Sequence, residues 1–389
     1  MFRINILFIC ITTALLASCV WPTPKPGEPI PTLITTTQWS AQEQTVTITV
    51  EASHITPHTV RLYKNGLLGG AVQEGTSAPF TFTLDATEFS PGEVEVIVMA
   101  FNDSTIVVEK KPIPIYGCNG FHALCDRSYA QVRYATTHNA MSNSTDGWIG
   151  PNQTFDVPAQ LAAGVRGLML DTYRADATNL LGQPQIPDAT PGSTWLCHSV
   201  CALGKQPLAE GLTEIATFLG ENPGEVITII LESYLSHAEE AQAFEAAGLT
   251  EHAYAHDGTQ WPTLGELIDS GKRLVVLKDR STNPLYPWQM NVWSHAFETH
   301  FSAASAEDFS CAVNRGNSAN ALFIFNHFLT EIFGSAELAT QVNFNPLLRN
   351  RIEECESFHG TIANFITVDH VSIGDTLQNI EALNNVGAF

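Results

Sequence analysis

The sequence predicts an α/β protein, a (β/α) TIM-like barrel preceded by a small all-β sandwich. After about residue 117, short apolar runs alternate with amphipathic helical segments, which is typical of a parallel sheet covered by helices. Before that point, apolar and polar residues alternate with a period of two, which is typical of antiparallel strands. A chain of 389 residues is long enough to form both domains.

Seven apolar runs in the second part each close on a polar residue. They are Tyr134–Thr137 before His138 and Asn139, Val165–Leu170 before Asp171, Trp195–Cys197 before His198, Val226–Leu231 before Glu232, Leu274–Leu277 before Lys278, Leu322–Phe325 before Asn326, and Phe365–Val368 before Asp369. In a β/α barrel the reactive groups lie at the carboxyl ends of the strands. We therefore expect these polar side chains to meet on one rim.

Helical segments separate several of these runs. Pro207–Leu219 has an amphipathic pattern and leads through Asn222-Pro223-Gly224 into the next apolar run. Glu239–Ala247 is a second helical segment, followed by Gly248. Strand followed by helix, repeated, predicts a parallel sheet.

The all-β domain is predicted over residues 37–115, and a second domain over 117–389. The alternating runs of the all-β domain are Thr45–Val50, Thr59–Tyr63, Phe80–Leu84, Val94–Val98 and Thr105–Val108. The hairpin Leu62–Gly66 and the segment Ala78–Phe82 resemble bacterial immunoglobulin-like modules. No group of titratable residues converges here, which favours a spacer or adhesive role. Two prolines within Lys111–Gly117 mark the boundary.

Residues 1–18 have the character of a signal peptide, with a positive charge at Arg3 and an apolar run too short to span a bilayer. The segment Leu16–Cys19 resembles a bacterial lipobox, in which the signal is cut before a cysteine that is then acylated. We expect an exported lipoprotein, anchored in the membrane through Cys19 at the bacterial cell surface or periplasmic face. Residues 19–36 would form a Pro-rich tether. The alternative is an ordinary secretory signal with an incidental cysteine.

Six of the eight cysteines remain when Cys10 and Cys19 are set aside. An even number of cysteines in an exported protein predicts disulfides, and six cysteines allow fifteen pairings. Proximity in sequence favours the pairs Cys118–Cys125 and Cys197–Cys201, which leaves Cys311 to pair with Cys355.

The formal charge of −22 argues against nucleic acid or an anionic membrane surface as an electrostatically captured partner. The sequence also lacks a GxSxG, HExxH, Walker or dinucleotide-binding motif. Serine hydrolase, zinc protease and nucleotide-binding functions therefore lack support. A lipid substrate would be reached through the acyl anchor and a locally positive or metal-bearing pocket.

Two histidines and three carboxylates on one rim suit phosphodiester cleavage. One imidazole, at His138 or His198, can take a proton from a nucleophilic hydroxyl while the other gives a proton to the leaving group. A cation would offset the charge that develops on the phosphate. Asn139, Asp171 and Glu232 offer the oxygen ligands that hard cations prefer. The alternative is that each histidine is only hydrogen-bonded at a strand end.

The region from Cys118 to about Asp279 resembles the X-domain family of phosphatidylinositol-specific phospholipases C, in particular its extracellular plant, fungal and bacterial branch. The resemblance rests on Cys118–Gly120, Leu124–Arg127, Thr136–Ser142, Gly164–Tyr173, Trp195–His198 and Asn222–Ile229 with Glu232. Phe365–Asp369 is similar to the last barrel strand of that family. In the family, an inositol 2-hydroxyl attacks the adjacent phosphorus, releasing diacylglycerol and leaving a cyclic phosphate.

The resemblance implies three catalytic residues. His138 matches the general base, His198 matches the general acid, and Asp369 matches the carboxylate that orients the base. The implied calcium ligands of the metal-dependent branch are Asn139, Asp171 and Glu232.

The resemblance also implies a phosphate-binding lysine at Lys278, and we place Asn326 beside it as a substrate-binding residue. Met169 stands where the calcium enzymes carry a glutamate, and Tyr173 stands where the metal-free bacterial enzymes carry an arginine. We nevertheless expect Ca²⁺, because an incomplete all-oxygen site tolerates irregular, water-completed geometry better with the larger ion.

Three functions are compatible with the sequence. The first is a phosphodiesterase of the phosphatidylinositol-specific phospholipase C type that cleaves an inositol phospholipid or a related phosphodiester. The second is a non-catalytic surface protein that binds lipid or carbohydrate on a degenerate barrel. The third is a glycerophosphodiesterase-like enzyme. Both histidines and Asp369 are present, which favours an enzyme.

Overall fold

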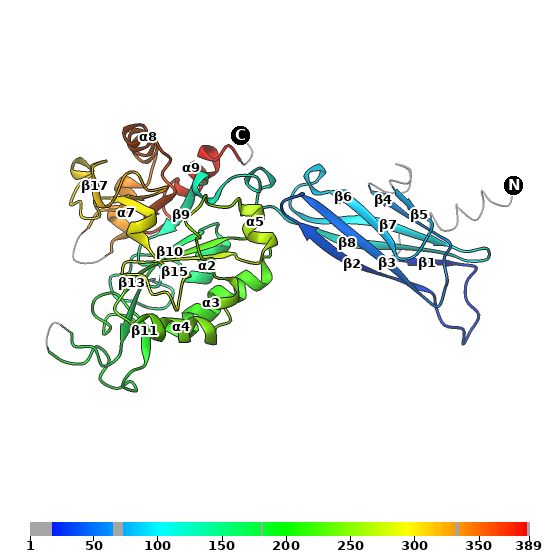
Figure 1. Cartoon of the computed structure of the whole chain (residues 1–389), viewed down its shortest axis with the longest axis horizontal. Helices are drawn as coiled ribbons and strands as arrows, with labels where there is room; N and C mark the ends of the chain where they lie inside the picture. Colours follow the sequence, from blue (N-terminus) through cyan, green and yellow to red (C-terminus); the bar gives the residue numbers. More distant parts are fainter. Residues whose placement is uncertain (1–17, 65–72, 180–181, 331–333, 387–389) are drawn as a thin grey trace. The chain divides into compact units, whose positions relative to one another are not determined.

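The computed structural model describes residues 18–64, 73–179, 182–330 and 334–386 (Figure 1). The chain divides into two compact units, Met1–His122 and Ala123–Phe389. Nearly all of the predicted signal peptide lies outside the described residues, as do Asn65 and Gly66 of the predicted hairpin. No helix within the described ranges is long and apolar enough to cross a membrane.

The first unit consists of two antiparallel sheets around a shared core. One sheet has the strand order β1-β8-β7-β4-β5 and the other β2-β3-β6. The strands are β1 Ser18–Trp21, β2 Thr32–Ser40, β3 Thr45–Ser53, β4 Thr59–Lys64, β5 Gln73–Gly75, β6 Phe80–Asp85, β7 Gly92–Phe101 and β8 Ile106–Ile115. Alternate residues, such as Ile48, Phe82 and Val98, are buried between the sheets. The period of two in the sequence therefore corresponds to side chains that point alternately into the core and toward the surface.

Two boundaries of the first unit differ from the prediction. Strand β1 and the first part of β2 lie inside the segment that we expected to be a tether, because β1 pairs with β8 and β2 pairs with β3 along its whole length, with Leu33 buried in the core. Strand β8 continues to Ile115 through two prolines. One edge of β8 pairs with β7 along its whole length, but the other edge pairs with β1 only over residues 106–109. The two prolines lie beyond that range, where this second edge has no paired strand and a missing N–H is tolerated.

The second unit is built on one curled sheet with helices against it (Figure 1). Its path is β15-β14-β13-β10-β9-β19-β18-β16-β17. The strands on this path are β9 Tyr134–Thr137, β10 Gly167–Arg174, β13 Ile227–Ser233, β14 Leu274–Lys278, β15 Gln289–Asn291, β16 Ala296–Thr299, β17 Val313–Gly316, β18 Leu322–Asn326 and β19 Phe365–Val368. All neighbouring pairs except β16 and β17 are parallel.

The described sheet is a curled partial barrel, which agrees with the predicted TIM-like barrel in its parallel strands but is not closed. Strands β15 and β16 would complete the ring, but they are not paired. Only helix α6, Val292–His295, separates them. A connection between parallel neighbours takes a dozen or more residues, so this short helix cannot bring β16 alongside β15. Strand β16 pairs with β18 instead.

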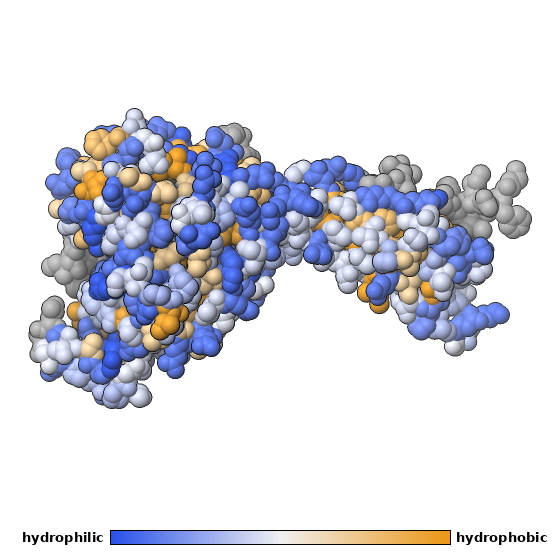
Figure 2. Space-filling view, viewed as in Figure 1, coloured by the Kyte–Doolittle hydropathy of each residue, from blue (hydrophilic) through white to orange (hydrophobic). Residues whose placement is uncertain are grey.

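Helices cover the outside of the sheet and bury one face each. They are α2 Val157–Ala162, α3 Leu208–Glu221, α4 His237–Ala246, α5 Leu264–Asp269, α7 Ala336–Val342, α8 Leu347–His359 and α9 Thr376–Leu383. Leu212, Ile215 and Leu219 of α3 are buried, as the amphipathic pattern predicted. Helix α4 begins with a capping box between Ser236 and Glu239. Hydrophilic residues cover most of the visible surface of each unit (Figure 2).

The apolar run before His198 is not a strand of the parallel ring. It forms β11, Thr194–Leu196, which pairs antiparallel with β10 and with the short β12, Gln206–Pro207. The histidine therefore reaches the rim on a loop beside β10. Strand β10 also continues to Arg174, so that Asp171 lies within the strand rather than at its exit.

Candidate active site

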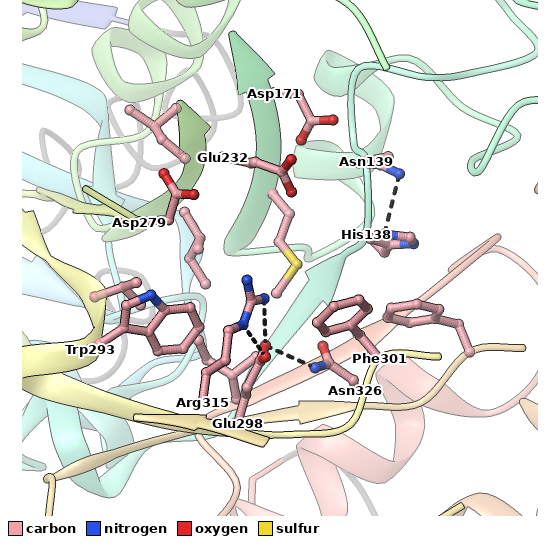
Figure 3. Close-up of a pocket in the computed structure, with 16 residues that line it drawn as sticks. His138, Asn139, Asp171, Glu232, Asp279, Trp293, Glu298, Phe301, Arg315 and Asn326 are labelled. Atoms are coloured by element: carbon pink, nitrogen blue, oxygen red, sulfur yellow. Dashed lines mark hydrogen bonds and ion pairs between the residues drawn. The ribbon is translucent and has the colours of Figure 1, made fainter. Parts of the chain in front are cut away.

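Polar side chains from the carboxyl ends of several strands line one open cleft of about 530 Å³. Six residues predicted from the sequence lie in it: His138, Asn139, Asp171, His198, Glu232 and Asp369. A smaller pocket of about 110 Å³ adjoins the cleft and shares several of these residues (Figure 3). The fold thus brings these predicted site residues together at the rim.

The best-defined contact in the cleft joins His138 to Asp369. Nδ1 of His138 lies 2.9 Å from Oδ1 of Asp369. The imidazole stacks on Phe328, with ring centroids 3.9 Å apart and planes inclined by 8°. A carboxylate at Nδ1 holds a neutral imidazole in the tautomer with the proton on Nδ1. Nε2 is then left as an acceptor.

Two neighbouring side chains that the sequence did not reveal support this pair. Nδ2 of Asn152 donates to both carboxylate oxygens of Asp369, at 3.2 and 3.3 Å. Nε2 of Gln153 donates to the backbone carbonyls of His138 and Val368, at 2.9 and 3.0 Å. These amides lie in an irregular loop, where no periodic pattern in the sequence could have indicated them.

Asn139 has a left-handed backbone conformation, with φ of 46°. Asparagine tolerates this conformation better than most residues. Its Nδ2 lies 3.2 Å from Nε2 of His138 and 3.3 Å from Oδ1 of Asn152. Oδ1 of Asn139 has no hydrogen-bond partner among the described residues, so it is available to a ligand in the cleft.

His198 follows β11 on a loop closed by the Cys197–Cys201 disulfide. Its ring makes no hydrogen bond to another described residue. Burial, and then the proximity of His138, lower the pKa of His198 below the ordinary histidine value, although Glu232 and Asp369 act in the opposite direction. The second histidine of the cleft is therefore held mainly by its loop.

The other four cysteines that we predicted to form disulfides are also oxidised. A second bridge joins Cys311 to Cys355. Cys118 and Cys125 are each disulfide-bonded as well. Cys19 is a free, partly buried cysteine in β1.

Three carboxylates, Asp171, Glu232 and Asp279, lie on one side of the smaller pocket (Figure 3). Asp171 is 6% exposed, and its side chain has no hydrogen-bond donor among the described residues. Burial, followed by repulsion from Glu232 and Asp279, raises the pKa of Asp171 well above its usual range. The hydroxyl of Tyr234 donates to Glu232 at 2.5 Å. Asp279 accepts from the backbone N–H of Ser233 at 3.0 Å and pairs with Arg280 at 2.9 Å. Among these three carboxylates, only Asp171 therefore lacks a hydrogen-bond donor within the described residues.

The donor set of Asn139, Asp171 and Glu232 is small for a hard cation. No group of three or more His, Cys, Asp and Glu side chains is arranged to hold a metal ion within the part of the chain that the structure describes. The predicted set contains only two such groups, Asp171 and Glu232, together with the amide oxygen of Asn139. All three donors are oxygens, and Asp171 is buried without a partner. This chemistry suits Ca²⁺, which takes oxygen ligands and completes its shell with water.

Lys278 is not placed to bind a substrate, which corrects our prediction. It is completely buried, and Nζ donates to Glu240 of α4 at 2.6 Å and to the carbonyl of Leu235 at 3.3 Å. Successive residues of a strand face opposite sides of a sheet. The side chain of Lys278 therefore points toward the helices, and the next residue, Asp279, lines the pocket.

Asn326 lines the smaller pocket, but its amide is already engaged. Nδ2 donates to Glu298 at 3.1 Å and to the carbonyl of Thr299 at 2.8 Å. Glu298 also accepts two hydrogen bonds from Arg315, at 2.5 and 3.1 Å. The guanidinium of Arg315 lies over the rings of Trp293 and Phe301.

Arg315 and Glu298 were missed in the sequence. Both lie in the antiparallel pair β16 and β17, whose strands are too short to give a periodic signal. Among the described residues, Arg315 is the only arginine or lysine that lines either pocket.

The residues of the cleft lie in a region that matches a known protein family. The model of the family described as PI-PLC X 1 matches residues 124–384. An uncharacterized secreted protein of Arthroderma benhamiae is 27% identical over 345 residues, which cover 80% of this chain and 74% of the relative. The PI-PLC X domain-containing protein 1 of the same fungus is 26% identical over 294 residues, which cover 69% of this chain and 90% of the relative.

Two solved structures are also similar to the chain. The phosphatidylinositol-specific phospholipase C of Staphylococcus aureus has a TM-score of 0.45 and 13% identity, covering 67% of this chain and 94% of the other. A calcium-dependent phosphoinositol-specific phospholipase C from a Gram-negative Pseudomonas has a TM-score of 0.30 and 16% identity, covering 51% of this chain and 76% of the other.

Proposed function

The chain belongs to the PI-PLC X family, and we propose that it is a phosphodiesterase that cleaves an inositol phospholipid or a related phosphodiester by acid–base catalysis with two histidines. The observation that carries this proposal is the contact of His138 with Asp369 in a cleft that also holds His198. A histidine paired with a carboxylate, together with a second histidine in the same cleft, can carry both proton transfers of such a reaction.

His138 is proposed as the general base. Asp369 at Nδ1 favours the tautomer in which Nε2 can accept a proton from the attacking hydroxyl, and it stabilises the imidazolium that results. Asn152 holds both oxygens of that carboxylate, and the ring is stacked on Phe328. The attacking oxygen then forms a bond to phosphorus as the bond from phosphorus to the leaving oxygen breaks.

His198 is proposed as the general acid that donates a proton to the leaving oxygen. It lines the same cleft as His138 but comes from a separate loop. An imidazole with a lowered pKa gives up its proton more readily than an ordinary histidine. In an inositol lipid the leaving group would be diacylglycerol, and the product would be a cyclic phosphate.

Asn139, Asp171 and Glu232 are proposed to hold Ca²⁺. A bound calcium ion would offset phosphate charge and the mutual repulsion of the nearby carboxylates. The uncompensated burial of Asp171 supports this assignment. The glutamate that would complete the set is replaced by Met169, which lines the pocket without supplying a charge.

The lipid substrate and the anchor are part of the same proposal. A chain with a net charge of −22 does not collect on an anionic membrane through electrostatics. Acylation of Cys19 after export would hold the protein at a membrane without that attraction. We also propose that the first unit is an immunoglobulin-like spacer.

A panel of phosphodiester substrates tests the proposed function. Phosphatidylinositol, phosphatidylcholine and a glycerophosphodiester would each be incubated with the wild type and with His138→Ala, in Ca²⁺ and in chelator. Cleavage of phosphatidylinositol to a cyclic inositol phosphate, lost in the variant, is the expected result. Turnover of the glycerophosphodiester alone would indicate the related enzyme class. Lipid binding without any turnover would indicate a non-catalytic protein and overturn the proposal.

A further inference from the structure

Glu240 of helix α4 contacts three neighbouring strands through one buried carboxylate. Oε2 accepts a hydrogen bond from Nζ of Lys278 on β14 at 2.6 Å. Oε1 accepts from the hydroxyls of Thr172 on β10, at 3.2 Å, and Ser233 on β13, at 2.5 Å. All four side chains are completely buried. Because water does not reach these polar atoms, each needs its hydrogen-bond partners within the network.

Each strand residue that Glu240 contacts is adjacent to a carboxylate of the pocket. Thr172 follows Asp171, Ser233 follows Glu232, and Lys278 precedes Asp279. Adjacent residues of a strand face opposite sides of the sheet, so the network lies on the helix side and the carboxylates lie on the pocket side.

The register of the strands places these carboxylates at one level. Asp171 is directly opposite Glu232, and Thr172 is opposite Ser233. Lys278 is opposite Leu231, and the backbone N–H of Asp279 donates to the carbonyl of Leu231 at 3.1 Å. We call Asp171, Glu232 and Asp279 the carboxylate row.

Bringing the three carboxylates of the row together is electrostatically unfavourable. Asp171 is repelled by Glu232 and Asp279, and it is buried without a hydrogen-bond donor among the described residues. Asp279 itself is stabilised by the N–H of Ser233 and by Arg280. Side chains in such a row turn or move apart unless the backbone beneath them is fixed. A network that joins the residue next to each carboxylate supplies that restraint.

We propose that Glu240 is a positioning residue that holds the carboxylate row in place, and with it Asp171 and Glu232 of the proposed Ca²⁺ site. The inference rests on the proposed function, because it assumes that the row serves a cation. Glu240 acts through Thr172, Ser233 and Lys278, and it does not touch the ligand itself. Side chains that support metal ligands from behind affect metal affinity strongly even without contact to the ion.

An alternative role for the Lys278–Glu240 pair is stability alone. Buried ion pairs contribute little net stability compared with apolar residues of similar volume, so stability does not require one at this place. The two roles differ in one measurable consequence. A purely structural pair could be replaced by uncharged residues without weakening the binding of Ca²⁺.

The chain contains a matched control at the opposite ends of the same strands. Arg166 precedes β10 and Glu225 precedes β13, and the two are joined by an ion pair of 2.6 Å. This pair links the same strands as the network does, but it lies at the ends remote from the cleft. Glu225→Gln therefore tests the effect of losing a strand-joining ion pair as such.

Calorimetry with Ca²⁺ alone would compare the full chain with Glu240→Gln, Glu240→Gln/Lys278→Met and Glu225→Gln. Glu240→Gln alone leaves the buried charge of Lys278 without a partner, which can prevent folding. The double variant removes both buried charges, so we expect it to fold even where the single variant does not. We expect Ca²⁺ affinity to fall about 10- to 100-fold in both Glu240 variants. Glu225→Gln should keep the wild-type affinity, and thermal unfolding without Ca²⁺ would confirm that the proteins compared are folded.

The outcomes separate this inference from the proposed function. Wild-type Ca²⁺ affinity in the folded double variant, or an equal loss in Glu225→Gln, would overturn the inference. Cleavage of phosphodiesters by a wild type that binds no Ca²⁺ would also overturn it, while leaving the acid–base proposal intact. A wild type that binds Ca²⁺ but cleaves no phosphodiester would overturn the proposed function, and the affinities would still decide the role of Glu240.

Discussion

Nδ1 of His138 lies 2.9 Å from Oδ1 of Asp369, although 231 positions separate the two residues in the sequence. They meet because β9 and β19 are parallel neighbours, with Thr137 opposite Val368. The backbone N–H of His138 donates to the carbonyl of Val368 at 3.1 Å, which continues the ladder to the rim. The curled sheet therefore creates this pair by joining the first and last strands of its parallel ring.

Replacing His138 by alanine should lower phosphodiesterase kcat by about 10²- to 10⁴-fold, because one proton transfer is lost. Asp369→Asn should impair the same step, since it removes the acceptor for the Nδ1 proton. The double variant should be little worse than His138→Ala alone, because the two residues act as a unit. Single-turnover rates of the three variants measure this coupling. Multiplicative losses would show that the residues act separately.

The pH dependence of kcat/KM should reveal the lowered pKa of His198. Burial disfavours the protonated ring, so the general acid loses its proton at a lower pH than an ordinary histidine would. Activity should therefore decline on the alkaline side from below about pH 6.5, the ordinary histidine value. NMR titration of the His198 ring should give the same pKa. A pKa at or above the ordinary value would contradict the assignment.

Asp171→Asn should stabilise the protein while abolishing the binding of Ca²⁺. The folded pKa of Asp171 is raised, so its ionisation weakens folding as pH rises from about 3.9 through the folded value. At neutral pH without Ca²⁺, the variant should therefore be more stable to unfolding than the wild type. Urea unfolding at several pH values measures the gain.

Asp176 provides a control of opposite sign for that experiment. It is an exposed carboxylate whose pKa is lowered, chiefly by a hydrogen bond from Arg174. Asp176→Asn should therefore give no stabilisation at neutral pH. Equal stabilisation by both substitutions would mean that the burial of Asp171 is not the cause.

Breaking the Cys197–Cys201 disulfide should impair catalysis more than it impairs folding. The loop is short, so its closure contributes about 2 kcal/mol to stability. The same loop carries His198, whose ring makes no hydrogen bond to another residue in the described ranges. Cys197→Ser/Cys201→Ser should leave the unfolding transition cooperative but lower kcat. Non-reducing peptide mapping of the wild type should also show whether Cys118 pairs with Cys125.

Cys19→Ala should release the protein from the membrane into the soluble fraction of the producing bacterium. The expectation follows from the lipobox-like Leu16–Cys19 and the Pro-rich segment after it. Fractionation with mass spectrometry of the N-terminal peptide would detect the acyl group. Unchanged partitioning of the variant would remove the lipoprotein assignment.

The sequence alone indicated most of the cleft. Apolar runs that close on a polar residue identified His138, Asp171, Glu232 and Asp369, because the carboxyl ends of parallel strands share one rim. His198 was also identified, although β11 is antiparallel and reaches the rim by a different route. Local periodicity is enough for such predictions, since it depends only on which residues are apolar.

Tertiary structure decided what local patterns leave open. At the end of β14, the sheet turns Lys278 toward Glu240 and Asp279 toward the pocket, and a one-residue difference in register would exchange them. Asn152 and Arg315 enter from an irregular loop and a short strand, so no periodic signal marks them. The gap between β15 and β16 likewise depends on connection length and pairing. Register, facing and long-range contact are properties of the assembled sheet, because each depends on segments that are distant in the chain.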